Sequence, residues 1–191
     1  MFLKCLHNAE SPLWQEQIKA RIAVRDVNMK FWLEYNVFTP VWWLMIITFM
    51  AVCIIWWKLV DKTRLLEIVA YGLMVALLST IFDIAGAEMV FWGYPNMVEP
   101  LIPPLFIVDL GVLPVAYMLV YQYFTDWKKY IIAMSVTAFF FAFIGEPIAE
   151  WLNMYQITNW KHIYSFPIYI ALGIFLKWIM NIIILRETKS Q

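Results

Sequence analysis

Apolar residues fall into five long runs that are separated by short polar segments. A helix that crosses a bilayer core of about 30 Å needs about 20 mostly apolar residues. The runs reach or nearly reach that length, at about 40–57, 65–90, 104–124, 130–152 and 164–185. Short links between them imply neighbouring antiparallel helices in one bundle. The pattern predicts an all-α, polytopic membrane domain of five transmembrane helices over 40–185, with a C-terminal tail at 186–191.

The first 39 residues are more polar than the rest and form a separate tail. Ser11 followed by Pro12 is typical of a helix N-cap and a first-turn proline. Trp14, Ile18 and Ile22 then recur every four residues. We expect an amphipathic helix over 11–36, which either lies on the membrane surface or packs, solvated, on the loops. The tail lacks the apolar core of a signal peptide, so no cleavage is expected.

Composition agrees with a chain whose main partner is a lipid bilayer. The sequence is 63% hydrophobic and 15% charged, with a mean hydropathy of +0.70, whereas soluble domains average about 45–50% apolar and about 25% charged residues. The net charge of +0 leaves no basic field to hold a nucleic acid. Two cysteines (Cys5, Cys53) and two histidines (His7, His162) provide neither a disulfide framework nor a zinc motif. No metal site is therefore expected, and no cofactor can be named. A partner protein or a second copy of the chain remains open.

Basic residues favour one orientation in the cell membrane. Seven Lys and Arg residues flank the spans on one side, and Lys161 is the only one in the loops of the other side. Cytoplasmic flanks carry the excess of positive charge. We therefore expect the N-terminus outside and the C-terminus in the cytoplasm, although counting the whole N-terminal tail reduces the difference to seven against six.

Acidic residues inside the expected spans are the strongest candidates for function, because a charge at the centre of a spanning helix costs at least ~2.5–3.5 kcal/mol. At ~1.5 Å per residue, Asp83, Asp109 and Glu146 lie roughly 7–10 Å inside the same, outer face. Other acids and aromatic side chains lie above that layer. The predicted outward-facing acidic pocket is formed by Asp83, Asp109, Glu146, Glu150, Glu88, Trp92 and Tyr94, with Glu99, Tyr155 and Trp160 nearby. The alternative is that these acids only hold helices together.

Helical spacing gives three further expectations. Asp83 belongs to a stripe of small residues, which is typical of a helix–helix contact face: Gly72, Ala76, Ser79, Asp83 and Gly86. Pro147 frees a backbone carbonyl near Phe143, beside Glu146, and either adds an oxygen ligand there or only kinks the helix. Lys177 lies nearer to the cytoplasmic boundary than to the acids, and its long side chain is expected to extend to that boundary.

An offset of 63 residues relates several positions of the chain. It joins acid to acid, aromatic to aromatic, Asn to Asn and Pro to Pro, in the pairs Asp83 and Glu146, Trp92 and Tyr155, Asn96 and Asn159, and Pro104 and Pro167. Two helices per unit give copies of parallel topology, as in some transporters. The alternative is coincidence within a biased composition.

Five segments resemble an uncharacterised family of small polytopic membrane proteins from endospore-forming bacteria. These are NVFTPVWWL, WWKLVDKTRLLEI, LIPPLFIVDLGVLPVAYMLVYQYF, GEP and ITNWKHIYSFPIYI, within about 31–179. The resemblance implies no known activity. Residues 80–120 are more weakly similar to membrane lycopene cyclase domains, through Asp83, Trp92-Gly93-Tyr94 and Pro104 followed by Asp109. In that family an acidic pair directly after the proline is implicated in protonating a polyene, and Leu105 and Phe106 stand there in this chain.

Three functions follow as hypotheses. In the first, the protein binds a proton, a cation or a small amphiphile in the acidic pocket, as a transport or sensing component. In the second, suggested by the cyclase similarity, a protonated carboxylic acid acts on an isoprenoid-like lipid within the membrane. In the third, the chain is a structural membrane subunit. The sequence contains none of the common hydrolase, metalloprotease or phosphate-binding motifs.

Overall fold

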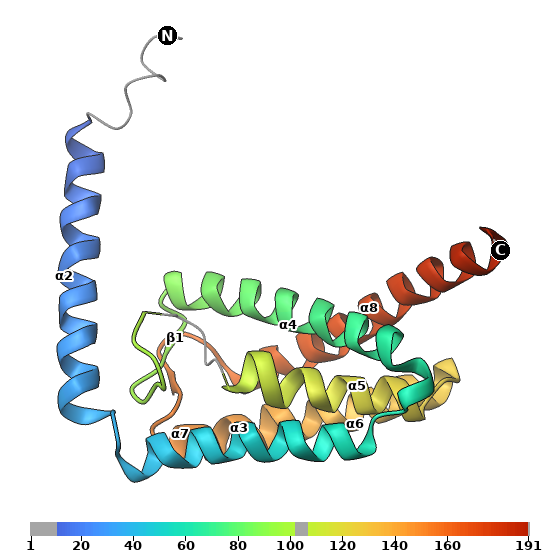
Figure 1. Cartoon of the computed structure of the whole chain (residues 1–191). Helices are drawn as coiled ribbons and strands as arrows, with labels where there is room; N and C mark the ends of the chain where they lie inside the picture. The colour runs from blue at the N-terminus through green and yellow to red at the C-terminus, as the bar shows by residue number, and fades with distance from the viewer. Residues whose placement is uncertain (1–10, 102–106, 191) are drawn as a thin grey trace, which may run out of the picture.

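The computed structural model describes residues 11–101 and 107–190, and this part of the chain is almost entirely helical (Figure 1). The elements are α2 (Pro12–Tyr35), α3 (Pro40–Leu59), η2 (Lys62–Arg64), α4 (Leu65–Glu88), β1 (Trp92–Gly93), η3 (Val108–Val112), α5 (Leu113–Tyr123), α6 (Trp127–Phe140), η4 (Phe141–Gly145), α7 (Glu146–Trp151), β2 (Gln156–Ile157) and α8 (His162–Ser190). The all-α prediction is confirmed.

Four helical stretches within the described residues are long and apolar enough to cross a membrane: Pro40–Leu59, Lys62–Glu88, Trp127–Trp151 and His162–Glu187. In α3 only Met45 is fully buried, and many of its large apolar side chains are exposed, such as Leu44, Ile47 and Ile54. Such large exposed apolar surfaces mark contact with a membrane or with another protein. The expected third span is described only over its helical part from Val108 to Tyr123, and its start, with Pro103, Pro104, Leu105 and Phe106, lies outside the described residues.

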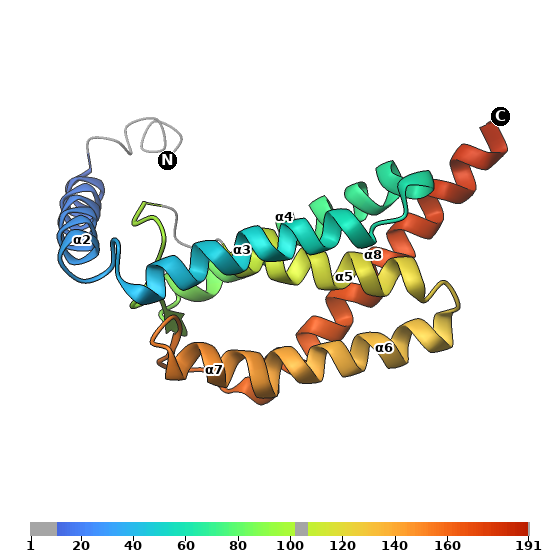
Figure 2. The ribbon, with the colours of Figure 1, turned by 60° about the horizontal axis from the view of Figure 1, so that its bottom comes forward.

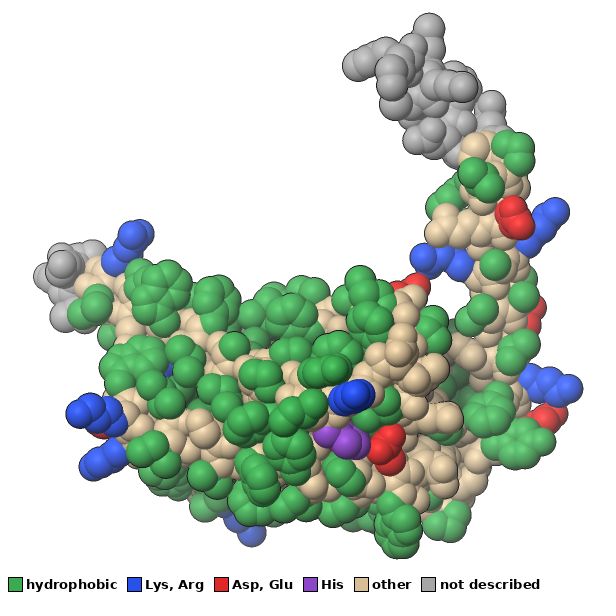
Figure 3. Space-filling model, turned by 180° about the vertical axis from the view of Figure 1, so that it is seen from behind, with side chains coloured by type: hydrophobic (Ala, Val, Ile, Leu, Met, Phe, Trp, Pro, Cys, Tyr) green, Lys and Arg blue, Asp and Glu red, His purple; other side chains and the backbone are tan. Residues whose placement is uncertain are grey.

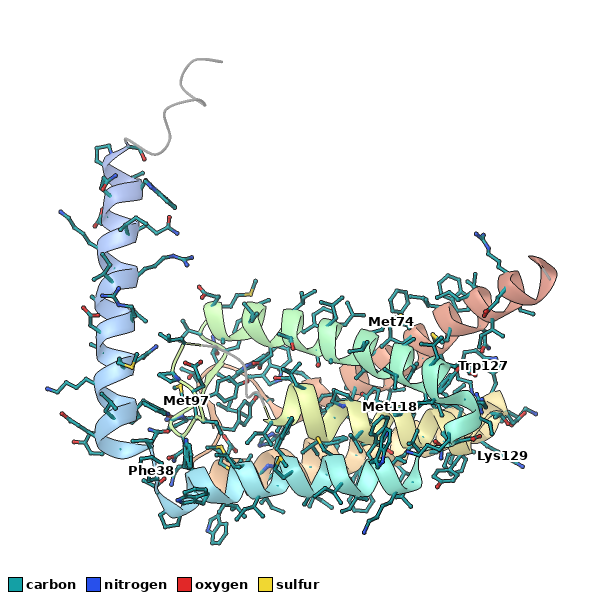
Figure 4. All side chains as sticks on the ribbon, in the orientation of Figure 1. Phe38, Met74, Met97, Met118, Trp127 and Lys129 are labelled. Carbon is teal, nitrogen blue, oxygen red and sulfur yellow. The ribbon has the colours of Figure 1, made fainter. Side chains whose placement is uncertain are left out.

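Bundle packing centres on α4, α5, α6 and α8: α4 packs on α5, and α8 contacts both α4 and α6 as it crosses between them (Figure 2). Tyr71, Tyr117 and Tyr130 are completely buried there. The hydroxyl groups of Tyr71 and Tyr130 lie 2.8 Å apart, and Tyr130 donates to the carbonyl of Gly173 at 2.9 Å. Met118 fills the gap between α4 and α5 against Gly72 (Figure 4). This packing confirms that the small-residue face of α4 meets a neighbouring helix.

The predicted N-terminal helix is present as α2, and the hydroxyl of Ser11 accepts from the amide of Trp14 at 3.2 Å. The helix stands away from the bundle and runs across its direction (Figure 1). None of its side chains is buried, and exposed apolar residues occupy adjacent positions such as Leu13 and Trp14. Adjacent positions are about 100° apart on a helix. The helix therefore has apolar side chains on more than the one face that the spacing of Trp14, Ile18 and Ile22 suggests.

Asn36, between α2 and α3, fixes the loop that carries Tyr94. Its buried amide donates to the carbonyl of Pro95 at 3.1 Å and accepts from the amide of Met97 at 2.6 Å. Trp32 donates to the carbonyls of Met97 and Val98, both at 3.1 Å. A single side-chain amide can serve a donor and an acceptor at once, and here it ties the start of the first span to the loop above α4.

Two π-helical turns precede prolines inside the bundle. The turn Val108–Val112 comes before Pro114, and the turn Phe141–Gly145 comes before Pro147. A proline ring clashes with the carbonyl four residues earlier, and a widened turn removes that clash. Asp109 lies within the first π-turn, and Glu146 follows the second directly. Such turns are frequent at functional sites, and the simple kink considered for Pro147 is in fact a local widening.

Two short strands lie at one end of the bundle, and their pairing relates residues that are 63 positions apart in the sequence. Strand β1 pairs antiparallel with β2, with Gly93 opposite Gln156 and Trp92 opposite Ile157. Gly93 and Gln156 are themselves 63 positions apart. The counterparts of Trp92 and Ile157 at this offset are Tyr155 and Tyr94, whose rings lie 5.9 Å apart. This arrangement is what two units related by a two-fold rotation would give.

The helix ends before the two strands also match. After α4, the amides of residues 89, 90 and 91 donate to the carbonyls of residues 85, 87 and 86. After α7, the amides of residues 152, 153 and 154 donate to the carbonyls of residues 148, 150 and 149. Every donor and acceptor is shifted by 63. Val90 and Asn153 occupy the same left-handed position, with φ of 57° and 54°.

The left-handed position provides a reciprocal test of this equivalence. Asn tolerates this conformation, whereas a β-branched residue is strained in it. We expect Val90→Asn to raise the free energy of unfolding by about 1 kcal/mol. Asn153→Val should lower it by a similar amount. Thermal unfolding of the detergent-purified variants, followed by circular dichroism, measures both changes, and equal signs for the two substitutions would contradict the shared geometry.

Candidate functional site

Asp83, near the end of α4, accepts hydrogen bonds from aromatic side chains of the loop that contains β1. We call this loop the first capping loop, and the loop that contains β2 the second capping loop. Its Oδ1 accepts from the indole Nε1 of Trp92 at 2.8 Å and also from the hydroxyl of Tyr94. The turn after α4 reverses the chain, so that Trp92 lies against Gly86, one helical turn beyond Asp83. The structure thus brings together three of the predicted site residues: the acid and the two aromatic side chains above it.

Asp109 is buried, with 8% of its surface exposed, and lies on the π-turn that begins the helix of α5. Its backbone carbonyl accepts from the hydroxyl of Ser79 at 3.3 Å, which joins it to the small-residue face of α4. Its carboxylate interacts electrostatically with Asp83. Two of the predicted intramembrane acids are therefore neighbours across the contact between α4 and α5.

Glu146 and Glu150 form the second half of the site, with His162 between them. The imidazole Nδ1 lies 2.6 Å from Glu146 Oε2, and Nε2 lies 3.1 Å from Glu150 Oε2. Glu146 Oε1 accepts from the hydroxyl of Tyr169 at 2.9 Å. Glu150 Oε1 accepts from the backbone amide of Ile157 in β2 at 3.2 Å. The side chain of Glu146 is only 11% exposed, against 25% for His162 and 35% for Glu150.

Tyr155 connects the two halves. Burial raises the pKa of Tyr155, and the charges of Glu146, Asp83 and Glu150 raise it further. Burial likewise raises the pKa of Tyr94, followed by the charges of Asp83 and Asp109. Both phenols therefore stay protonated at ordinary pH, and Tyr94 donates its hydrogen to Asp83. We call Asp83, Asp109, Glu146 and Glu150 the acidic cluster, since these shared neighbours place all four carboxylates at one end of the bundle.

Aromatic rings cover the acidic cluster. The ring of Trp92 lies 5.2 Å from that of Trp160 and 6.4 Å from that of Tyr155. Trp160 donates to the hydroxyl of Ser165 at 3.0 Å. The backbone carbonyl of Phe91 accepts from two amides of the second capping loop, at 2.9 and 3.0 Å. The cover is therefore built from both loops. The sequence likewise places these aromatic side chains above the acidic layer.

Not every predicted site residue joins the cluster. Glu88 ends α4 with an exposed side chain, and none of the hydrogen bonds described above involves it. Glu99 accepts from the amide of Leu101 at 3.0 Å, within its own loop. The helix end points Glu88 away from the bundle because its turn lies beyond the last packed residue, Gly86. Glu88 is therefore removed from the candidate site.

Two functional partners were missed at the sequence level. The sequence indicates His162 only as a candidate metal ligand, and among the described residues no group of three or more His, Cys, Asp or Glu side chains could hold a metal ion. Tyr169 lies seven residues later, two turns along α8 and therefore on the same face as His162. This spacing could have identified the pair, but only a known contact between α7 and α8 would have joined it to Glu146.

Lys177 lies far from these acids. Its ammonium group donates to the carbonyls of Phe124 and Thr125, at 2.8 and 2.9 Å, between α5 and α6. These carbonyls belong to the opposite end of the bundle, which Trp127 and Lys129 mark in Figure 4. The side chain thus extends toward the nearer end of its helix, as its length predicts. Figure 3 shows Lys and Arg side chains gathered at that end, and histidine beside an acidic side chain at the other.

Over residues 11–101 and 107–190, the fold and the site define a mainly helical protein with four helices long and apolar enough to cross a membrane and an acidic cluster under an aromatic cover at one end. Comparisons with protein-family models, with curated proteins and with solved structures find no match. The functional argument therefore depends on the chemistry of the cluster itself. Even a known fold would not determine the function, because one fold serves many functions.

Proposed function

We propose that this chain is an integral protein of the cell membrane that binds a proton, a cation or a small amphiphile at the outward-facing acidic cluster, as a component of a transport or sensing system. The cluster offers carboxylates for a positive charge and aromatic faces for an apolar group. Of these ligands, the proton has the strongest support. The observation that carries it is the position of His162 between two carboxylates.

Hydrogen-bond counting gives the reason. A neutral imidazole has one N–H and one acceptor nitrogen. Both ring nitrogens of His162 lie within hydrogen-bond distance of a carboxylate oxygen, so each contact needs its own hydrogen. Either the imidazole carries two protons, or one of Glu146 and Glu150 is protonated. The three side chains together hold one proton more than two carboxylates and a neutral imidazole would hold.

The extra proton connects structural elements. Glu146 begins α7, Glu150 is the residue before its last, and His162 begins α8. Loss of the proton leaves a carboxylate facing a nitrogen lone pair, so one of the two contacts becomes repulsive. A change in pH outside the cell would therefore alter how α7, α8 and β2 are held together.

Orientation and span number complete the proposal. We infer that the described helix from Val108 to Tyr123, with the segment before it, is a fifth span, because it lies between α3, α4 and α6. Lys58, Lys62, Lys128 and Lys129 flank the end opposite to the cluster, which favours a cytoplasmic location for that end. The offset of 63 in the helix ends and strand pairing supports two parallel copies of a helix–strand–helix unit.

A structural role is the competing function, since the hydrogen bonds of the cluster also join helices. Glu150→Gln separates the two. The amide mimics a protonated carboxyl group and can donate to a neutral His162. We expect the wild-type unfolding temperature to fall as the pH rises, since a proton bound only in the folded state stabilises that state until it is released. Glu150→Gln should make the profile nearly flat.

Thermal unfolding of the full chain in detergent, monitored by tryptophan fluorescence, provides the measurement. Glu88→Gln is the matched control, because it removes an acidic charge from the same end outside the cluster, and it should keep the wild-type pH profile. If the wild-type profile is already flat and Glu150→Gln is destabilised equally at every pH, the cluster serves structure alone.

A further inference from the structure

A second site lies at the opposite end of the bundle, between the start of α4, the end of α5 and the last turns of α8. A cavity of about 240 Å³ is found there. It is lined by Arg64, Glu67, Tyr121, Thr125, Lys177, Asn181 and Ile184. One water occupies about 30 Å³ of liquid, so the cavity has room for a group considerably larger than water.

The one negative charge in the lining is already balanced. Arg64 binds Glu67 through Nε and Nη2, at 3.0 and 2.6 Å, and the hydroxyl of Tyr121 donates to Glu67 Oε1 at 2.6 Å. Arg64 presents five N–H groups, and these two bonds leave others for a ligand. The Arg64–Glu67 pair is therefore close to neutral, but it still offers donors to the cavity.

Lys177 adds a positive charge that no salt bridge within the described residues balances. Its residue is 3% exposed. Two of its three N–H groups are used by the carbonyls of Phe124 and Thr125, and its nitrogen lies 4.0 Å from the centre of the Tyr130 ring. Asp126 interacts with it only at longer range. The lining as a whole has a net charge of one positive unit.

We propose that this cavity binds a phosphate group, with Arg64, Lys177 and the side-chain amide of Asn181 as donors. Phosphate is recognised by guanidinium and ammonium groups that present several N–H bonds to its oxygens. Basic pockets between transmembrane helices near the cytoplasmic face bind anionic lipid headgroups. The group could belong to a phospholipid headgroup or to free phosphate, and the two sources share this chemistry.

Exposed basic residues at this end of the bundle favour a phosphate over a neutral ligand. Lys62, Lys128, Lys129 and Arg186 all lie at this end with exposed side chains. They raise the local concentration of anions without contacting the cavity. They also attract any acidic membrane surface, so the experiment has to separate binding in the cavity from general attraction.

The test measures the unfolding temperature of the full chain in nanodiscs of phosphatidylcholine, with and without phosphatidylglycerol, and separately with inorganic phosphate. Phosphatidylglycerol should raise the unfolding temperature by about 5 °C. Asn181→Leu, which fills the cavity, and Asn181→Asp, which adds a negative charge at nearly constant size, should each abolish the increase. Lys128→Gln, which removes an exposed positive charge at the same end, should preserve it.

Each outcome decides the proposal. Stabilisation by inorganic phosphate that either Asn181 variant abolishes identifies a free-phosphate site. Stabilisation by phosphatidylglycerol alone, lost in the same variants, identifies a lipid headgroup site. Equal stabilisation of wild type and both Asn181 variants shows attraction to the surface and overturns the proposal, as does no stabilisation by either phosphate source. These outcomes do not depend on proton binding at the acidic cluster.

Discussion

Replacing Glu146 by alanine is expected to lower the free energy of unfolding by about 2–4 kcal/mol. Glu146 accepts hydrogen bonds from Tyr169 and contacts His162, both on α8, and its side chain is mostly buried. The truncation leaves a phenol and an imidazole without an acceptor in a region that water reaches poorly. Circular dichroism during heating of the detergent-purified protein should show an unfolding temperature lower by roughly 5–10 °C.

Two other variants define the cause of this loss. Glu146→Gln keeps an amide oxygen for Tyr169 and should recover part of the stability. Glu88→Ala removes a glutamate from an exposed helix end and should change the free energy by less than about 0.5 kcal/mol. If Glu88→Ala and Glu146→Ala are equally harmful, net charge at this end matters more than the contacts of Glu146.

Much of the fold could be predicted from the sequence, because long apolar helices and their ends leave strong local signals. Apolar runs located the four stretches that are long enough to cross a membrane, to within a few residues. Ser11, Thr39 and Asp126 cap the helices that follow them, each through its side-chain oxygen. Capping depends on neighbours in the sequence, so it is readable without a structure.

The candidate site was only partly predictable. Helical rise placed Asp83, Asp109 and Glu146 at a common depth, because depth follows from counting residues along a helix. It could not show that Trp92 and Tyr94 bind one acid while His162 and Tyr169 bind another, since these pairings depend on how the capping loops fold back. The exposed position of Glu88 depends on a single turn at the helix end, which residue counting does not resolve.

The two π-turns are the feature of the fold that the sequence pattern predicts least well. Pro114 and Pro147 predict a local disturbance, but a kink and a π-turn have the same sequence signal. In the structure each π-turn shifts the register of the following residues around the helix axis. Asp109 and Glu146 lie on or directly after these turns. Their direction, and hence the composition of the acidic cluster, is set by backbone geometry that no side-chain pattern records.

The contact between Gly86 and Trp92 provides the sharpest test of the aromatic cover. A Cβ atom at Gly86 would overlap the indole ring of Trp92. Alanine should normally stabilise a helix over glycine by about 1 kcal/mol, so a loss has to come from this overlap. Gly86→Ala should displace Trp92 from Asp83 and Trp160, and we expect it to lower the free energy of unfolding by about 2–3 kcal/mol.

Gly93 is the matched control, because nothing lies within 4 Å of the Cβ that alanine would add there, and its φ is not positive. Gly93→Ala should change the free energy by less than about 0.5 kcal/mol. Tryptophan fluorescence should shift toward the spectrum of a more exposed indole in Gly86→Ala and stay unchanged in Gly93→Ala. If both variants match the wild type in stability and fluorescence, Trp92 does not need its place over Asp83, and the aromatic cover is not held by this contact.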